Sequence, residues 1–161
     1  MTSLGSAVAV GTGPARSLRW QTSTGGALNL VRVQSAGCTT NCGADDTYRL
    51  RAYETTYTVP RFNNTGTQIT VLLLQNPTNA TINATVYFYN AAGTELVNQA
   101  FVLNPKTLVV VNTSTIPQAN GQAGSLVVTH DGAYGSLSGK TVALEPSTGF
   151  SFDSPMQPRS R

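Results

Sequence analysis

The stretch Thr67-Gln-Ile-Thr-Val-Leu-Leu-Leu-Gln-Asn76 decides the fold that we expect for this chain. It is β-branched at its start and continuously apolar from Val71 to Leu74. An apolar run of this length between turn residues is typical of a strand that is covered on both faces. The strand must end or turn at Pro77, because proline fixes φ and has no N–H group to donate.

The next stretch, residues 81–90, alternates between apolar and polar side chains. One phase holds Ile82, Ala84, Val86 and Phe88, so it predicts a strand with one buried and one solvated face. The following Asn-Ala-Ala-Gly predicts a hairpin turn, because glycine accepts a positive φ. The expected partner strand, residues 95–103, is apolar in both phases. Its buried phase stays open, since a bulge can switch it.

Further strand patterns follow the same rhythm on both sides of this hairpin. They recur about every 8–12 residues with turn signals between them, which is the signature of a sandwich or barrel. The segments concerned are residues 27–34, 48–54, 56–62, 108–111, 125–130, 141–144 and 149–153. No window has a helical period, and residues 114–124, with one proline and two glycines, predict a loop.

The fold that we predict is therefore all-β, an antiparallel β-sandwich of about 7–9 strands. Residues 47–154 form its core. Residues 1–46 are an irregular N-terminal arm and extension, and residues 155–161 are a C-terminal tail.

Composition narrows the function classes. The chain has 161 residues, enough for one domain with a real core, and only 11% of them are charged, against about 25% in an average soluble protein. The net charge of +3 comes from scattered basic residues, whereas nucleic-acid binding requires a concentrated basic stripe. The apolar runs are too short for a membrane-spanning helix. We expect no nucleic-acid partner and no membrane insertion.

The neutral surface, rich in hydroxyl and amide groups, is typical of proteins at the cell surface or outside the cell. We therefore expect an extracellular or cell-surface location. Residues 1–13 show no recognisable signal peptide. A virion protein, assembled without export, is an alternative that would account for this.

The two cysteines, Cys38 and Cys42, bound a five-residue span that is flanked by glycines. Such a span can close into a small disulfide loop, which implies an oxidising compartment. Free thiols or an intermolecular bridge remain open alternatives. A zinc site would need more ligands than these cysteines and the distant His130 supply. We expect neither a metal nor any other cofactor.

His130 and Asp131 are the one obvious acid–base pair. Adjacent residues on a strand point to opposite faces, so these two are poorly placed to act together. Ser125 lacks the Gly-x-Ser-x-Gly frame of a nucleophile elbow. We therefore expect a protein that is not an enzyme.

Two features are candidates for binding. Tyr87 and Tyr89 are predicted to face outward, with Tyr53 nearby, and could stack on sugars or contact a protein. Ordinary aromatic residues on a solvent face are the simpler interpretation. The apolar patch at Ala7, Val8, Ala9 and Val10 is either a flexible tail or a strand that completes the sheet of a neighbour.

The order of motifs in QNPTNATINATVYFYNAAGTELVNQAFVLNPKTLVVVNTSTI and GSLVVTHDGAYG resembles the immunoglobulin-like or fibronectin-type modules of secreted and surface bacterial proteins. The resemblance covers about residues 62–153. It implies a sandwich that serves in adhesion, spacing or assembly, and no active site carries over. Trp20 and the two cysteines do not occupy the positions of the antibody core.

These observations predict a non-catalytic structural or adhesion module. Its expected partner is a protein, either further copies that form a surface filament by strand addition or another surface protein. A carbohydrate-binding module and a virion coat or decoration protein are the alternatives.

Overall fold

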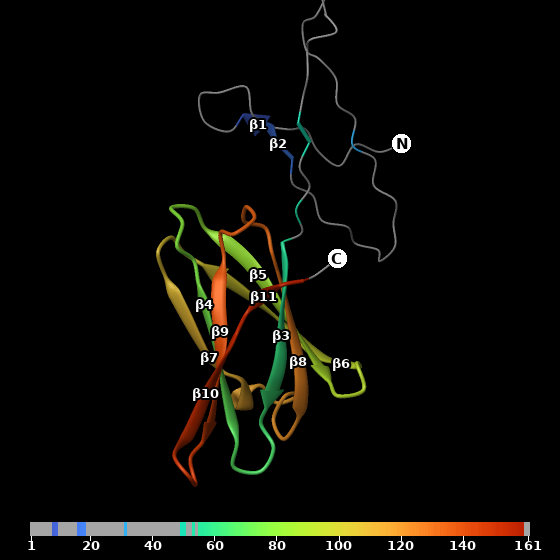
Figure 1. Cartoon of the computed structure of the whole chain (residues 1–161), viewed down its shortest axis with the longest axis vertical. Coiled ribbons are helices and arrows are strands. Elements are labelled where there is room, and N and C mark those ends of the chain that lie inside the picture. The colour runs from blue at the N-terminus through green and yellow to red at the C-terminus, as the bar shows by residue number, and fades with distance from the viewer. Residues whose placement is uncertain are drawn as a thin grey trace, which may run out of the picture. The chain divides into compact units, whose positions relative to one another are not determined.

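The computed structural model of the chain describes residues 8–9, 16–18, 31, 49–50, 53 and 55–159. The chain divides into two compact units, Met1–Ala52 and Tyr53–Arg161. In the first unit, β1 (Val8–Ala9) pairs with β2 (Arg16–Ser17) in a short antiparallel ladder. The second unit consists of two antiparallel sheets that pack face to face, which confirms the predicted all-β sandwich (Figure 1).

The first sheet has four strands in the order β10-β9-β4-β7. Their bounds are Phe150–Pro155 for β10, Ser138–Glu145 for β9, Ile69–Gln75 for β4 and Leu108–Asn112 for β7. The second sheet has five strands in the order β11-β3-β8-β5-β6. Their bounds are Gln157–Pro158 for β11, Thr56–Asn63 for β3, Ala123–His130 for β8, Ile82–Asn90 for β5 and Glu95–Leu103 for β6.

Two ends of the sandwich differ from the sequence expectation. Gln157–Pro158 pairs with β3 as β11, so part of the expected tail belongs to a sheet. Of the strand expected at residues 48–54, the described residues Arg49, Leu50 and Tyr53 lie outside any strand. The loop expected at residues 114–124 begins within a single 3₁₀ turn, Thr113–Thr115, and its last two residues already belong to β8. Of the strand expected at residues 27–34, only Val31 lies within the described residues.

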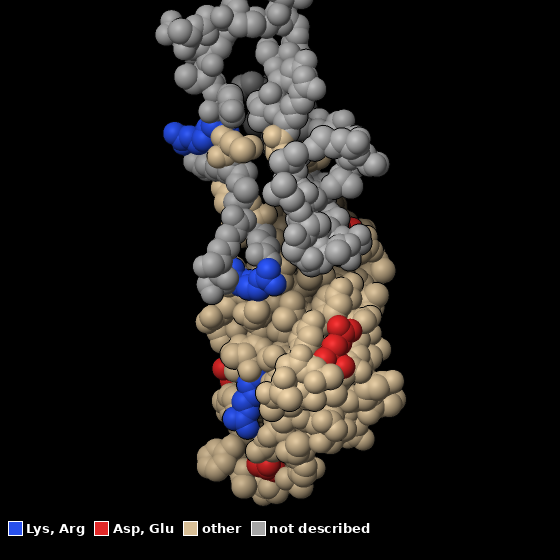
Figure 2. Space-filling model, turned by 90° about the vertical axis from the view of Figure 1, so that its right-hand side faces the viewer, with Lys and Arg blue, Asp and Glu red and all other residues tan. Residues whose placement is uncertain are grey.

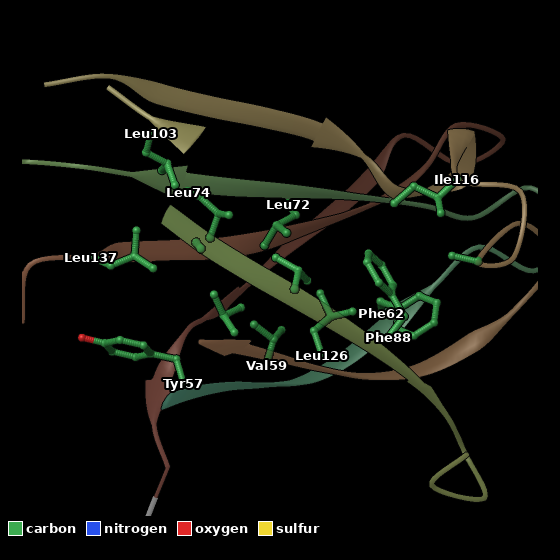
Figure 3. Packing of buried hydrophobic residues seen from close by; sticks show 14 of the residues in the cluster. Tyr57, Val59, Phe62, Leu72, Leu74, Phe88, Leu103, Ile116, Leu126 and Leu137 are labelled. Carbon is green, nitrogen blue, oxygen red and sulfur yellow. The ribbon is translucent and has the colours of Figure 1, made fainter. Parts of the chain in front are cut away.

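The core lies between the two sheets and is built mainly by alternating residues from β3, β4, β5 and β8, with Leu103 of β6 (Figure 3). The predicted inward phase of β5 is confirmed, because all four of its apolar residues are buried. Phe62 of β3 meets Phe88 of β5 edge to face, with ring centroids 5.5 Å apart. Each Leu, Ile or Phe side chain buried in this way contributes roughly 1.5–3 kcal/mol.

A bulge settles the phase of β6. The ladder between β5 and β6 shifts register between Phe88 and Tyr89. Beyond that shift, Val97, Phe101 and Leu103 pack on the core, whereas Val102 is exposed. Ala100 and Val102 of the second phase therefore face solvent, whereas Leu96, next to the bulge, also packs against the core.

The turn after β4 is held by a buried asparagine, Asn76. Its side-chain amide donates to the carbonyl oxygens of Ala80, Leu103 and Asn104, at 2.7–3.0 Å. Its side-chain oxygen accepts from the backbone N–H and the hydroxyl of Thr78. Asn76 thus ties the loop before β5 to the end of β6 and satisfies backbone groups that no strand pairs.

Replacing Asn76 with alanine should destabilise the sandwich by about 2–4 kcal/mol, because several buried carbonyls then lack a donor. The matched control is Asn79→Ala in the same turn, where the side chain is exposed and the loss should stay within about 0.5 kcal/mol. Urea unfolding, followed by far-UV circular dichroism, measures the free energy of unfolding of both variants. Equal losses in the two variants would contradict this role of Asn76.

Candidate functional site

The outward side of the five-stranded sheet is rich in hydroxyl groups. Cross-strand pairs place Thr56, Thr129 and Thr85 in one row, and Thr58, Val127 and Tyr87 in the next. Figure 2 shows the side on which β3, β8 and β6 lie in Figure 1, and charged residues are few on it. This face has the composition of an ordinary solvated sheet surface.

Tyr87 and Tyr89 lie on this face, as the alternation of β5 predicts. Tyr87 pairs with Asn98 and Val127, and Tyr89 pairs with Glu95 and Ser125. Partial burial raises the pKa of the Tyr89 phenol, and the Glu95 carboxylate raises it further. The Tyr89 phenol therefore stays neutral at physiological pH.

Tyr53 does not join these two tyrosines. It precedes β3 and stacks on Tyr134 of the loop between β8 and β9, with ring centroids 4.6 Å apart. That stack lies toward the end of β8 at His130, whereas Tyr89 pairs near the start of β8. The predicted contact surface is thus divided into two separate aromatic groups.

His130 and Asp131 point to opposite sides of their sheet, as expected for neighbours on a strand. The His130 ring is buried and stacks on Tyr57, with ring centroids 5.6 Å apart. The Asp131 carboxylate accepts from the backbone N–H and the side-chain amide of Asn83, at 2.8 and 2.7 Å. Burial raises the pKa of the Tyr57 phenol, which also accepts a hydrogen bond from the backbone of Gly135.

The sequence analysis missed the group of small residues around His130. A Cβ atom added to Gly132 would lie 2.2 Å from the Ser136 hydroxyl and 3.0 Å from His130 Nδ1, so only glycine fits there. The Ser136 hydroxyl donates to the Ala133 carbonyl at 2.6 Å. This geometry fits a role in closing the loop after β8. In the sequence, the Asp131-Gly132 pair indicated a turn at this position.

The outward side of the four-stranded sheet has a different character. The inward residues of β4 are Thr70, Leu72 and Leu74, which are fully buried. The opposite phase of β4 and its neighbours β7 and β9 is also apolar, and we call this surface the apolar outer face. It consists of Ile69, Val71, Leu73, Leu108, Val110, Val142 and Leu144.

These residues are adjacent across the strands. Val110 pairs with Leu73, Val71 pairs with Val142, and Ile69 pairs with Leu144. Leu108 and Val110 are 54% and 60% exposed, and the others are half-buried by their neighbours on the sheet. A contiguous apolar patch on a sheet face is a mark of an interaction surface, whereas single exposed apolar residues are ordinary.

One charged pair borders this surface. The Lys140 ammonium contacts the Asp153 carboxylate at 2.5 Å, and both side chains are about half exposed. Lys140 shares a cross-strand row with Leu73, and Asp153 shares the next row with Val142. A screened surface pair of this kind contributes about 0–1 kcal/mol to folding.

Two of the predicted sites fall partly or wholly outside the described residues. Cys38 and Cys42 do so entirely. Of the predicted strand-donor arm, Val8 and Ala9 form β1, and Ala7 and Val10 lie outside. Within the described part of the chain, no three His, Cys, Asp or Glu side chains gather to hold a metal ion. That part also contains no helix of the length and hydropathy needed to cross a bilayer.

Comparison with known proteins identifies a fold and no family. No protein-family model matches the chain, and no curated protein matches it. The crystal structure of Thermotoga maritima 1070 is similar, with a TM-score of 0.58 and 8% sequence identity, over 68% of this chain and 97% of that one. At this identity the likeness shows the sandwich fold alone. The immunoglobulin-like resemblance stays a prediction.

Two adjacent leucines test the assignment of the faces of β4. Leu72→Ala should destabilise the fold by about 2–5 kcal/mol, because it leaves a cavity in the core. Leu73→Ala should cost under about 1 kcal/mol, because that side chain packs on one side only. Urea unfolding at low protein concentration, where association does not contribute, measures both. A cost for Leu73→Ala as large as that for Leu72→Ala would contradict the assignment.

Proposed function

We propose that this protein is a non-catalytic structural module that works by contact with other proteins, foremost with copies of itself in an extracellular assembly. The observation that carries the proposal is the apolar outer face. A monomer that works alone in water gains nothing from a sheet with apolar residues on both sides, and exposed patches of this kind promote association.

The contrast between the two outward faces supports the same function. The outward face of the five-stranded sheet mixes Thr, Ser and Asn side chains with Tyr87, Tyr89, Val102 and Val127. In the four-stranded sheet, three neighbouring strands turn Val, Leu and Ile side chains outward in one contiguous patch. A contiguous apolar patch of this kind fits a surface that is covered in the working assembly.

Edge strands offer a second kind of contact. β6 and β7 each pair on one side only, so each has unpaired backbone groups along the other side. Such edges accept an additional strand from another chain. On the opposite side of the five-stranded sheet, β11 covers Tyr57 and Thr58 of β3. The rest of β3 is less suited to strand addition, because Pro60 lacks an N–H and the ladder with β8 is irregular between Val59 and Phe62.

The predicted donor for strand addition is the arm at Ala7, Val8, Ala9 and Val10. In the structure Val8–Ala9 pairs with Arg16–Ser17, so donation would exchange that short ladder for a longer one on a neighbour. Two residues per strand hold the existing ladder weakly, which makes the exchange energetically accessible. A module with such an arm and a free edge can extend into a filament.

The full chain should therefore form species larger than its monomer mass of 16.9 kDa, and deleting residues 1–13 should stop growth into long polymers. Sedimentation velocity and electron microscopy of both proteins measure this. The control lacks residues 160–161, at the other end of the chain after β11, and should assemble like the full chain. A full-length protein that stays monomeric at high concentration would contradict the proposed self-assembly.

A second candidate function is carbohydrate binding by Tyr87 and Tyr89. It is favoured by their position on a flat face beside the polar groups of Asn98, Glu95 and Ser125. Aromatic rings stack on the apolar faces of sugars while neighbouring polar groups bind the hydroxyls.

If this face binds glycans, a glycan array should give hits with the unmodified protein. The double variant Tyr87→Ala, Tyr89→Ala should bind the same glycans at least tenfold more weakly, because both stacking rings are lost. Tyr134→Ala, in the separate aromatic group, is the matched control and should keep the hits. An array without hits for the unmodified protein argues against carbohydrate binding.

A further inference from the structure

We infer that the apolar outer face binds the same face of a second copy of this chain, so that two sandwiches pack sheet against sheet in a two-fold symmetric pair. The inference rests on the proposed function of self-assembly and names the surface that carries its first contact. It is distinct from strand addition, which uses sheet edges and the N-terminal arm.

The shape of the surface fits a second sheet. The apolar residues come from three neighbouring strands in register, so they form a continuous layer of β-branched and leucine side chains. Sheets that pack face to face in sandwiches interdigitate such layers about 10 Å apart. The inner faces of this same protein pack in that way (Figure 3).

The charges on the surface favour a second copy over an unrelated partner. Among the outward positions of the four described strands, the charged side chains are Lys140 and Asp153, one of each sign. A face with one positive and one negative group is complementary to itself after a suitable rotation. An acidic or basic partner would leave one of the two charges facing its like.

The register defines that rotation. Lys140 lies in the row of Leu73 and Val110, and Asp153 lies in the next row, with Val71 and Val142. A two-fold axis that runs across the strands, between these rows, exchanges them. It places Leu73 of one copy over Val71 of the other, and it brings Lys140 of each copy alongside Asp153 of the other. Closed two-fold pairs of this kind are the commonest assemblies of identical chains.

Two exposed valines make a matched pair of probes. Val110 lies on the apolar outer face and is 60% exposed, and Val102 lies on β6, on the outward side of the other sheet, and is 64% exposed. Val110→Lys should weaken formation of the two-fold pair at least tenfold, because it puts an uncompensated charge into the contact. Val102→Lys should leave that pair intact, and any loss of longer polymers in this variant reports strand addition at the β6 edge. Sedimentation velocity of the full chain measures both, and circular dichroism confirms that both variants fold.

Charge reversal tests the two-fold geometry directly. Lys140→Asp and Asp153→Lys each put like charges against each other in a pair of identical variants, so each should associate about tenfold more weakly than the unmodified chain. An equimolar mixture of the two variants should regain association, because each charge then meets its opposite across the contact. The pair within each chain stays broken in the mixture, so only an intermolecular contact accounts for the recovery.

The outcomes separate the two proposals. If the unmodified chain associates and the Val110→Lys variant associates equally well, the inference is overturned. Self-assembly would then rest on the sheet edges or the N-terminal arm. Loss of association by Val110→Lys without recovery in the mixture overturns the two-fold arrangement. A full-length chain that is monomeric overturns both proposals.

Discussion

The rest of the structure depends on one constraint, that β4 is apolar in both phases of a two-residue repeat. Its side chains alternate between the faces of the sheet, so burying Leu72 and Leu74 in the core forces Val71 and Leu73 to the outside. A shift of the strand register by one residue would exchange the two sets, and both the inner and the outer face of the strand would still be apolar. The strand is apolar on both sides whatever register it takes, and a covering layer is therefore needed on each side.

The first covering layer is the five-stranded sheet. Its strands β5 and β8 are apolar in one phase and hydroxyl-rich in the other, so they supply a core face and a solvated face. Their register is tightly specified, because a slip would put threonines and tyrosines into the core. In the core, a sheet whose strands β5 and β8 have one apolar and one hydroxyl-rich face thus packs against a sheet whose strand β4 is apolar on both faces.

The polar parts of the chain fix where these strands end. Asn64 and Asn76 are buried at opposite ends of the β4 region and bond to backbone groups from distant loops. Asn64 binds the Ala119 carbonyl and the backbone N–H of Thr70, and Thr113 donates to it. Such buried amides rigidify the turns, since leaving any of their partners unpaired in the core is costly. Because the loops are fixed in this way, the outer face of β4, β7 and β9 is a flat and persistent surface, suited to recognising a partner.

The sequence by itself determined the local features: the strand positions of β3 to β10, the inward phase of β5 and the turns between them, because strand periodicity and turn chemistry are short-range properties. It also indicated that residues 71–74 are apolar toward both faces of their sheet. Only the tertiary structure decided which strands become neighbours. That choice set Val110 beside Leu73 and Val142 beside Val71, separated Tyr53 from Tyr87 and Tyr89, and used Gln157–Pro158 as a strand. Pairings between residues far apart in the chain come from packing the whole sandwich, and no local pattern in the sequence encodes them.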